Sequence, residues 1–216
     1  ANRETILNFM KESGAWSLLR QRPYNTIPNP EVTPRDIFVS TFDSAPLAPD
    51  SAVVVAGQEA AFQMGIDVLA RLTDGQVHLG LDGRGETAPP AAFTEAVNAS
   101  KRYFKGKHPV GNVGVQIHHT APVGGGDIVW VLGVQEVITL GNLFKEGRFD
   151  ASRVVALVGA ELETPHYVRT YAGANVGELL KGNLKQDNVR YISGDVLSGD
   201  QKTPNSYLNF YDDQLT

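Results

Sequence analysis

Short apolar runs alternate with segments of helical period between residues 37 and 145, and this alternation restricts the fold more than any other feature of the chain. The runs that look like buried strands are 37–39, 77–81, 103–104 and 128–132. The segments that look like helices are 58–72, 93–100 and 134–145. Strands that alternate with helices in this order predict an α/β domain with a mostly parallel sheet.

The regions on either side of this alternation have a different character. Residues 3–13 carry apolar side chains at helical spacing and predict a helix. Four prolines within 15–34 exclude a continuous helix or a central strand there. After residue 150 the spacing shortens, and strands are expected at 154–158, 167–171 and 189–192, with a short helix at 176–180. That order fits a small β-grasp unit, so we place two domains, at 1–150 and 151–216.

Composition excludes several classes of protein. The 216 residues contain no cysteine, so disulfides, thiolate nucleophiles and cysteine metal sites are all excluded. The net charge is −5, from 24 acidic and 19 basic residues, which argues against a general nucleic-acid binder. No apolar run reaches the roughly 18–20 residues that a membrane span needs. We therefore expect a soluble, cytoplasmic protein. We also expect that the chain is cut at both ends from a longer protein, because the sequence starts without methionine and stops abruptly.

Glycine-rich turns do not form a convincing phosphate site in this sequence. No G-x-G-x-x-G is present, and Gly83-Arg84-Gly85 is followed by two prolines rather than by a helix start. Gly124-Gly125-Gly126 precedes a strand, which is the wrong order for a phosphate cradle, and the pair Gly111 and Gly114 is a weak signal. Tight turns explain these glycines better.

Histidines and serines give no catalytic or metal pattern. Of the histidines at 108, 118 and 119, the adjacent two point to opposite faces of a strand, or lie about 100° apart on a helix. Neither arrangement aims both rings at one ion, so we expect no metal site. The serines lie in no G-x-S-x-G elbow, and no catalytic residues are expected.

The segment 16–28 is the most distinctive candidate for binding. It combines a tryptophan, two leucines, two arginines and a tyrosine with a backbone stiffened by proline. Such a segment suits a quinone head group, which offers a flat ring for stacking and carbonyls that accept hydrogen bonds. The alternative is a strap whose aromatic side chains fill the core and whose arginines pair with surface acids.

Several distinctive motifs are spread over nearly the whole chain. Near the start they are Glu12-Ser13-Gly14-x-Trp16-x-x-Leu19-Arg20-x-Arg22-Pro23 and Ile37-Phe38-Val39-Ser40-Thr41-x-Asp43-Ser44-x-Pro46-Leu47-Ala48. Later ones are Gly106-x-His108-Pro109-x-Gly111, Trp130-x-x-x-x-Gln135-Glu136-Val137-Ile138, Val168-Arg169-Thr170 and Ile192-Ser193-Gly194-x-Val196-Leu197-Ser198-Gly199. In this order the motifs resemble the NqrA family, one of the subunits of the sodium-translocating NADH:quinone oxidoreductase. The family's members are about twice this long, and the chain matches their central part.

The resemblance implies an architecture and a cofactor content. Members are similar to the flavin-bearing, NADH-binding subunit of respiratory complex I and to ferredoxin-linked relatives, which implies a Rossmann-like α/β domain followed by a soluble-ligand-binding β-grasp (SLBB-like) module. Those relatives carry a glycine-rich loop near the first helix for the flavin phosphate. Residues 16–24 stand at that place here and contain no glycine. We therefore expect no redox cofactor on this chain, with NADH and flavins held by other subunits.

The resemblance also implies a role in a complex. We expect a peripheral subunit on the cytoplasmic side of the bacterial inner membrane, which packs against the membrane subunits and contributes to the quinone site. The residues expected at that site are Trp16, Leu19, Arg20, Arg22, Pro23 and Tyr24. Two alternatives stay open: a flavin- or NADH-binding dehydrogenase domain, and a scaffold whose segment 16–28 is a buried strap.

Overall fold

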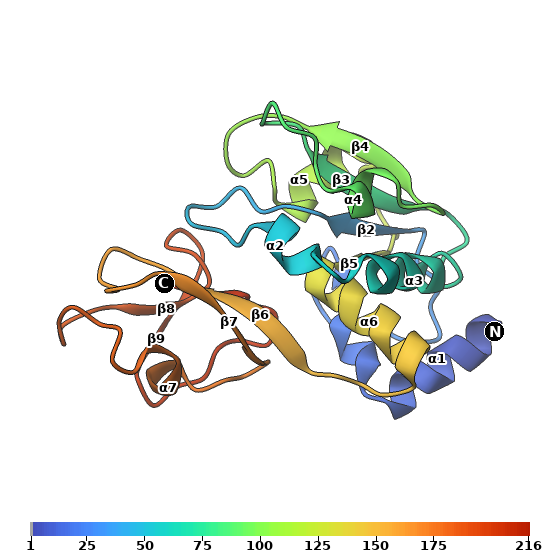
Figure 1. The fold of residues 1–216 in the computed structure, drawn as a ribbon. Helices are drawn as coiled ribbons and strands as arrows, with labels where there is room; N and C mark the ends of the chain where they lie inside the picture. The colour runs from blue at the N-terminus through green and yellow to red at the C-terminus, as the bar shows by residue number, and fades with distance from the viewer. Residues whose placement is uncertain (1) are drawn as a thin grey trace. The chain divides into compact units, whose positions relative to one another are not determined.

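A computed structural model describes residues 2–216, and its internal contacts divide the chain into two compact units (Figure 1). The first unit runs from the N-terminus to Ser44 and resumes over Ser51–Asp150. The second contains Ala151–Thr216 and also the short segment Ala45–Asp50. A short segment that belongs to the second unit therefore interrupts the first unit in the sequence.

A five-stranded sheet forms the centre of the first unit, with the order β1-β5-β2-β3-β4. Four strands are mutually parallel, and β1 joins β5 as an antiparallel edge strand. The bounds are Arg20–Arg22 (β1), Asp36–Ser40 (β2), Val77–Asp82 (β3), Ser100–Phe104 (β4) and Val129–Leu132 (β5). The predicted α/β domain with a mostly parallel sheet is confirmed.

Helices lie on both faces of this sheet. Ile117 of α5 packs with Phe38, Val129 and Val131, so these residues define what we call the α5 face. The opposite face carries Trp130. Its ring packs edge-on against the ring of Trp16, with the ring centroids 5.3 Å apart. The helices are α1 (Arg3–Glu12), a 3-10 turn η1 (Ala15–Leu18), α2 (Ser51–Val55), α3 (Glu59–Leu69), α4 (Ala91–Thr94), α5 (Val113–Thr120) and α6 (Val134–Glu146).

Two helices of the first unit, α3 and α6, approach each other closely because both carry glycine at the crossing. A Cβ atom on Gly65 would collide with the backbone of Val137, and one on Gly141 would collide with the carbonyl of Ala61. Phe62, in the same turns of α3, is fully buried. Backbone contact at these two positions sets the separation of the helices, and with it the packing of the core.

The helices of the first unit differ in part from those expected. The helix expected at 93–100 ends at Thr94, and β4 already begins at Ser100. The helix α5 was not predicted, since glycines and histidines hide its period; it is capped by Asn112, whose side chain accepts a hydrogen bond from the amide of Gly114 at 2.8 Å.

The second unit is a five-stranded mixed sheet with the order β7-β6-β10-β8-β9, as expected of a β-grasp module. Its elements are β6 (Ser152–Leu157), β7 (His166–Tyr171), α7 (Val176–Leu180), β8 (Tyr191–Ser193), β9 (Asp200–Lys202) and β10 (Gln214–Leu215). Strands β9 and β10, of three and two residues, were not predicted. The core is made by Val155, Leu157, Leu162, Val176, Leu180, Leu208 and Leu215.

The segment Ala45–Asp50 is bound into this second unit by two polar contacts. The side-chain amide of Gln214, which is buried, donates to the carbonyl of Pro46 at 3.1 Å. The amide of Asp50 donates to the hydroxyl of Tyr167 at 2.9 Å. The fold of the second unit thus uses residues that come from a distant part of the sequence.

We predict that Gly141→Ala destabilises the first unit. Alanine is the better helix former, but its methyl group must displace the backbone of Ala61, and over-packing of this kind costs about 1–3 kcal/mol. Urea unfolding followed by circular dichroism measures the change. Gly125→Ala is the matched control, because a Cβ atom there meets no heavy atom within 4 Å. Equal stability of the two variants would contradict the prediction.

Candidate functional site

The structure divides the six predicted site residues among three environments. Trp16 and Leu19 are core residues, with 8% and 0% of their surface exposed. The indole N–H of Trp16 donates to the carbonyl of Pro28 at 2.8 Å, which ties the two ends of the segment together. These two side chains therefore attach the segment to the core and are buried.

Pro23 and Tyr24 lie at the other extreme, in an exposed turn. An isolated bridge between Gln21 and Thr26 closes this turn, and the amide of Gln21 donates to the carbonyl of Thr26 at 2.6 Å. Tyr24 is 82% exposed, the largest exposure among the large hydrophobic side chains of residues 2–216. Its ring is thus free to meet a ligand or a partner.

Arg20 and Arg22 lie between these extremes, on the edge strand β1. The antiparallel register places Arg20 opposite Val131 and Arg22 opposite Val129. Directly opposed residues share one face of a sheet, so both arginines belong to the α5 face. Burial lowers the pKa of Arg22, and the positive charge of Arg20 lowers it further.

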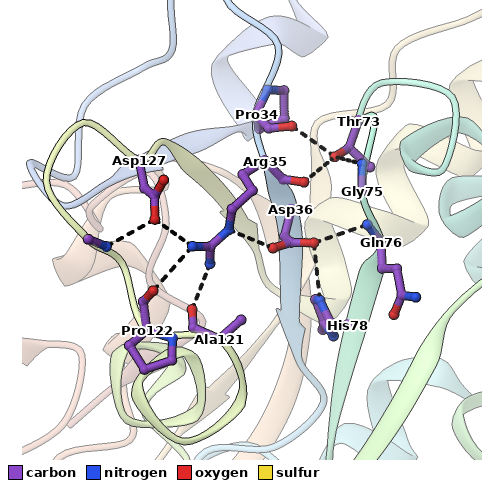
Figure 2. Close-up of polar contacts among 11 residues, drawn as sticks. Pro34, Arg35, Asp36, Thr73, Gly75, Gln76, His78, Ala121, Pro122 and Asp127 are labelled. Atoms are coloured by element: carbon purple, nitrogen blue, oxygen red, sulfur yellow. Dashed lines mark hydrogen bonds and ion pairs between the residues drawn. The ribbon is translucent and has the colours of Figure 1, made fainter.

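A second polar cluster, which the sequence analysis missed, lies at the amino-terminal edge of the parallel strands (Figure 2). Arg35 donates through Nε to Asp36 at 2.8 Å and through Nη1 to Asp127 at 2.5 Å. Its Nη2 donates to the carbonyl of Ala121 at 2.7 Å. One guanidinium therefore joins the start of β2 to the end of α5 and to the loop that precedes β5.

Asp36 extends this cluster to the neighbouring strand β3. Its carboxylate accepts hydrogen bonds from the amide of Gln76 at 3.1 Å and from Nε2 of His78 at 3.3 Å (Figure 2). Burial acts to raise the pKa of Asp36, but the hydrogen bonds from Gln76, Arg35 and His78 outweigh it and lower the pKa below its usual value. The ring of His78 also stacks on Phe38, with centroids 4.6 Å apart.

A depression of about 420 Å³ lies beside this cluster, lined by Val32, Thr33, Pro34, Arg35, Asp74, Gly75, Gly126, Asp127 and Ile128. The charged groups of Arg35 and Asp127 are already paired with each other there. Their pairing makes the cluster a clamp between strands and loops.

The opposite, carboxyl-terminal edge is where α/β sheets of this kind usually bind nucleotides. The strand order reverses between β2 and β5, and ligands bind preferentially in the crevice at such a point. Here the carboxylate of Glu136 accepts a hydrogen bond from the amide of Gly133 at 3.1 Å, at the start of α6. A negative charge of the protein itself thus occupies the helix end that would otherwise attract a phosphate.

Side chains also fill the neighbouring part of this edge. The amide of Gln116 donates to Ser40 Oγ at 2.8 Å, and it lies so close to β3 that a Cβ atom on Gly80 would overlap it. Ser44 Oγ accepts from the amide of Gly111 at 2.8 Å and lies 3.1 Å from Nδ1 of His108. These contacts join the loops after β2 and β4 directly, without a group between them.

The three histidines do not come together. His108 contacts Ser44, whereas His118 and His119 occupy the last turn of α5 with their rings 5.1 Å apart. Among residues 2–216 no group of three or more histidine, aspartate or glutamate side chains is placed to hold a metal ion. Within the same part of the chain, no helix has the length and apolar character needed to cross a membrane.

The glycine turns weighed in the sequence are held by local contacts. Arg84, between Gly83 and Gly85, pairs with Asp82 at 2.7 Å and lies over the ring of Phe42 at 5.0 Å. Gly124 donates its amide to Asp127. The interpretation of these motifs as tight turns agrees with the contacts.

The contact between Glu136 and Gly133 was also missed in the sequence, although a signal for it was present. A glutamate three residues after the start of a helix commonly reaches back to the first amide. The predicted helix at 134–145 places Glu136 at that position relative to Gly133.

Solved structures with the same fold define the class of protein. A chain of the NAD⁺-reducing [NiFe]-hydrogenase in its H2-reduced state superposes with a TM-score of 0.68 and 13% identity, over 100% of this chain and 47% of that one. The air-oxidised state gives a TM-score of 0.65 and 14% identity, with the same coverage. At this identity the likeness shows the fold alone: a Rossmann-like α/β domain followed by a β-grasp module.

Family models and curated relatives identify the particular family. Residues 1–149 match the model described as NqrA second alpha/beta domain, and residues 154–203 match the NQRA C-terminal domain, of SLBB type. The chain therefore belongs to the NqrA family, and the resemblance noted in the sequence is confirmed.

Two relatives illustrate the extent of the match, and both are named as the A subunit of the Na(+)-translocating NADH-quinone reductase. The relative from Alcanivorax borkumensis is 43% identical over 216 residues, which cover all of this chain and 47% of the relative. The relative from Serratia proteamaculans is 45% identical over 209 residues, covering 95% of this chain and 45% of the relative. The chain thus spans about half the length of the curated relatives it matches.

We predict that Asp36→Asn removes about 1–3 kcal/mol of stability at neutral pH, because charge-assisted bonds to Arg35 and His78 are lost. The pKa of Asp36 is lower in the folded protein than in the unfolded chain, where it is about 3.9. Its contribution is therefore complete above that value and is lost as the pH falls through the folded pKa.

Urea unfolding at pH 7 and near pH 3 measures this difference, with the exposed Asp74→Asn as control. The gap between the wild type and Asp36→Asn should narrow at the acid pH. An unchanged gap, or an equal loss in Asp74→Asn, would show that the carboxylate of Asp36 is not the stabilising group.

Proposed function

We propose that this chain is the central part of the NqrA subunit of a Na⁺-translocating NADH–quinone reductase, where it contributes to quinone binding and to assembly and carries no redox cofactor of its own. The observation that carries membership is the match over the full length of the chain to relatives that bear this name. Within the chain, we keep 1–150 and 151–216 as the two functional domains.

The quinone surface that we propose is centred on the turn and edge strand of residues 20–24. Tyr24 offers an exposed ring, and Arg20 and Arg22, both half-buried on β1, add guanidinium groups near it. Trp16 and Leu19 support this surface from the core, and Pro23 shapes the turn between the donors and the ring. A flat ring with two carbonyl oxygens is the kind of ligand that such a combination binds.

The lack of a cofactor is supported by chemistry at the carboxyl-terminal edge. A flavin or a dinucleotide needs backbone amides free for its phosphates. The amide of Gly133 is already bound to Glu136, and a phosphate next to that carboxylate would meet an unfavourable like charge. NADH and flavins would therefore bind to other subunits of the complex.

The location follows from the same proposal. A peripheral subunit on the cytoplasmic side of the bacterial inner membrane would contact the membrane subunits and receive quinone where these meet. Nucleic acid is not among the expected partners, because acidic residues outnumber basic ones.

A second candidate function is a flavin- or NADH-binding dehydrogenase domain, which the fold shared with a chain of an NAD⁺-reducing hydrogenase favours. The visible absorption spectrum of the purified protein separates the two. We expect no flavin absorption from this protein itself, whereas stoichiometric bound flavin would establish the dehydrogenase function.

A photoreactive quinone analogue tests the quinone surface in the assembled complex. Mass spectrometry of the labelled protein should place the label within 20–24. We also predict that Tyr24→Ala raises the KM for quinone about fivefold with little change in kcat, as expected for the loss of about 1 kcal/mol of ring contact. Tyr207→Ala is the control, since Tyr207 is 62% exposed in the second unit.

Three results would contradict this proposal. They are a label confined to other residues, equal effects of the two tyrosine substitutions, and loss of assembly with unchanged quinone affinity. The last of these would favour a scaffold, consistent with the bond from Trp16 to Pro28 that closes the segment as a strap.

A further inference from the structure

Arg22 is a cationic side chain of the edge strand β1 whose environment leaves it unsatisfied. It is half-buried, and its Nε atom is inaccessible and has no hydrogen-bond acceptor among residues 2–216. The same part of the chain offers it no ion pair. A guanidinium stays charged at any ordinary pH, so burying part of it without an acceptor has a cost.

The carboxylates nearest to Arg22 by register are already occupied. Val129 lies between Arg22 on one neighbouring strand and Asp36 on the other, so those two residues stand about 10 Å apart, twice the spacing of strands. Asp36 is bound by Arg35, Gln76 and His78. Asp36 is therefore the acidic residue of this row of the sheet, and its carboxylate is already bound by these three residues.

Asp127 is engaged in the same way. It lies two residues before Val129, and its carboxylate accepts hydrogen bonds from Arg35 and from the amide of Gly124. Burial is the main cause that lowers the pKa of Arg22. The like charge of Arg20, on the same α5 face, lowers this pKa further. Two arginines thus stand on one face of β1, while the acids nearest in register to Arg22 are bound elsewhere.

We propose that Arg22 makes the quinone surface selective for ring ligands whose oxygen carries a negative charge. This inference rests on the proposed quinone function and adds the charge preference of that surface. The planar fork of a guanidinium matches two adjacent oxygen atoms, so an ionised hydroxyl next to a ring carbonyl is the best complement.

Two probes of the same ring size test the charge preference in the assembled complex. They are 2-hydroxy-1,4-naphthoquinone, which is an anion at neutral pH and has adjacent oxygens, and uncharged 1,4-naphthoquinone. Equilibrium dialysis measures the affinity of each probe. We expect the anion to bind roughly tenfold more tightly to the wild type, as a charge-assisted hydrogen bond allows. Arg22→Gln should weaken binding of the anion more than binding of the neutral probe, which loses only a hydrogen bond to an uncharged oxygen, and should thereby abolish the ratio.

Two further variants keep the result interpretable. Arg190→Gln makes the same substitution at an exposed arginine of the second unit and should keep the full ratio. Arg22→Lys keeps the positive charge without the fork and should keep part of the ratio. Circular dichroism melts show whether each variant is folded.

The possible outcomes separate this inference from the function on which it rests. Equal binding of both probes to the wild type, or a ratio that survives in Arg22→Gln, would overturn the charge preference while the quinone surface stands. Failure of both probes to bind to the wild type would overturn the quinone surface and the preference with it.

Discussion

The Arg35 guanidinium holds together the part of the first unit on which the candidate site depends. Through Asp36 and His78 it connects the starts of β2 and β3, and through Asp127 it fixes the loop that leads into β5. Strand β5 is in turn the only strand that pairs with the short edge strand β1 among residues 2–216. Arg35 pairs with both carboxylates, and Arg22 has no ion pair among residues 2–216.

The two edges of the parallel sheet have different consequences for function. The carboxyl-terminal edge, the usual place for a nucleotide, carries Glu136 at the start of α6 and Gln116 packed against Gly80. A fold shared with a chain of an NAD⁺-reducing hydrogenase does not by itself assign that chemistry to this chain, since function depends on the groups present at the site. The antiparallel edge strand, which lies outside the parallel part of the sheet, carries the arginines of our proposed quinone surface.

Much of the fold could be predicted from the sequence, because the parallel strands are buried and apolar, whereas the site depends on contacts that no local pattern reveals. Trp130 and its neighbours in β5 form such an apolar run. The helix α5 escaped prediction because its glycine, histidines and glutamine blur the apolar period. Arg35 and Asp127 are 92 residues apart in sequence. Within 16–28, composition could not separate the buried side chains from the exposed ones, since the change from a 3-10 turn to a strand resets the periodicity after η1.

The strap and the ligand surface were posed as alternatives for residues 16–28, but the structure assigns strap contacts to only some of the side chains. The bond from Trp16 to Pro28 and the burial of Leu19 are such contacts, and they hold the backbone on either side of β1. Pairing with β5 then fixes the face on which Arg20 and Arg22 stand. A segment held rigidly by its core residues loses little conformational entropy when its remaining side chains meet a ligand. Buried strap contacts can therefore support a binding surface on so short a strand, and only the effect of substitutions on quinone affinity separates that surface from a scaffold.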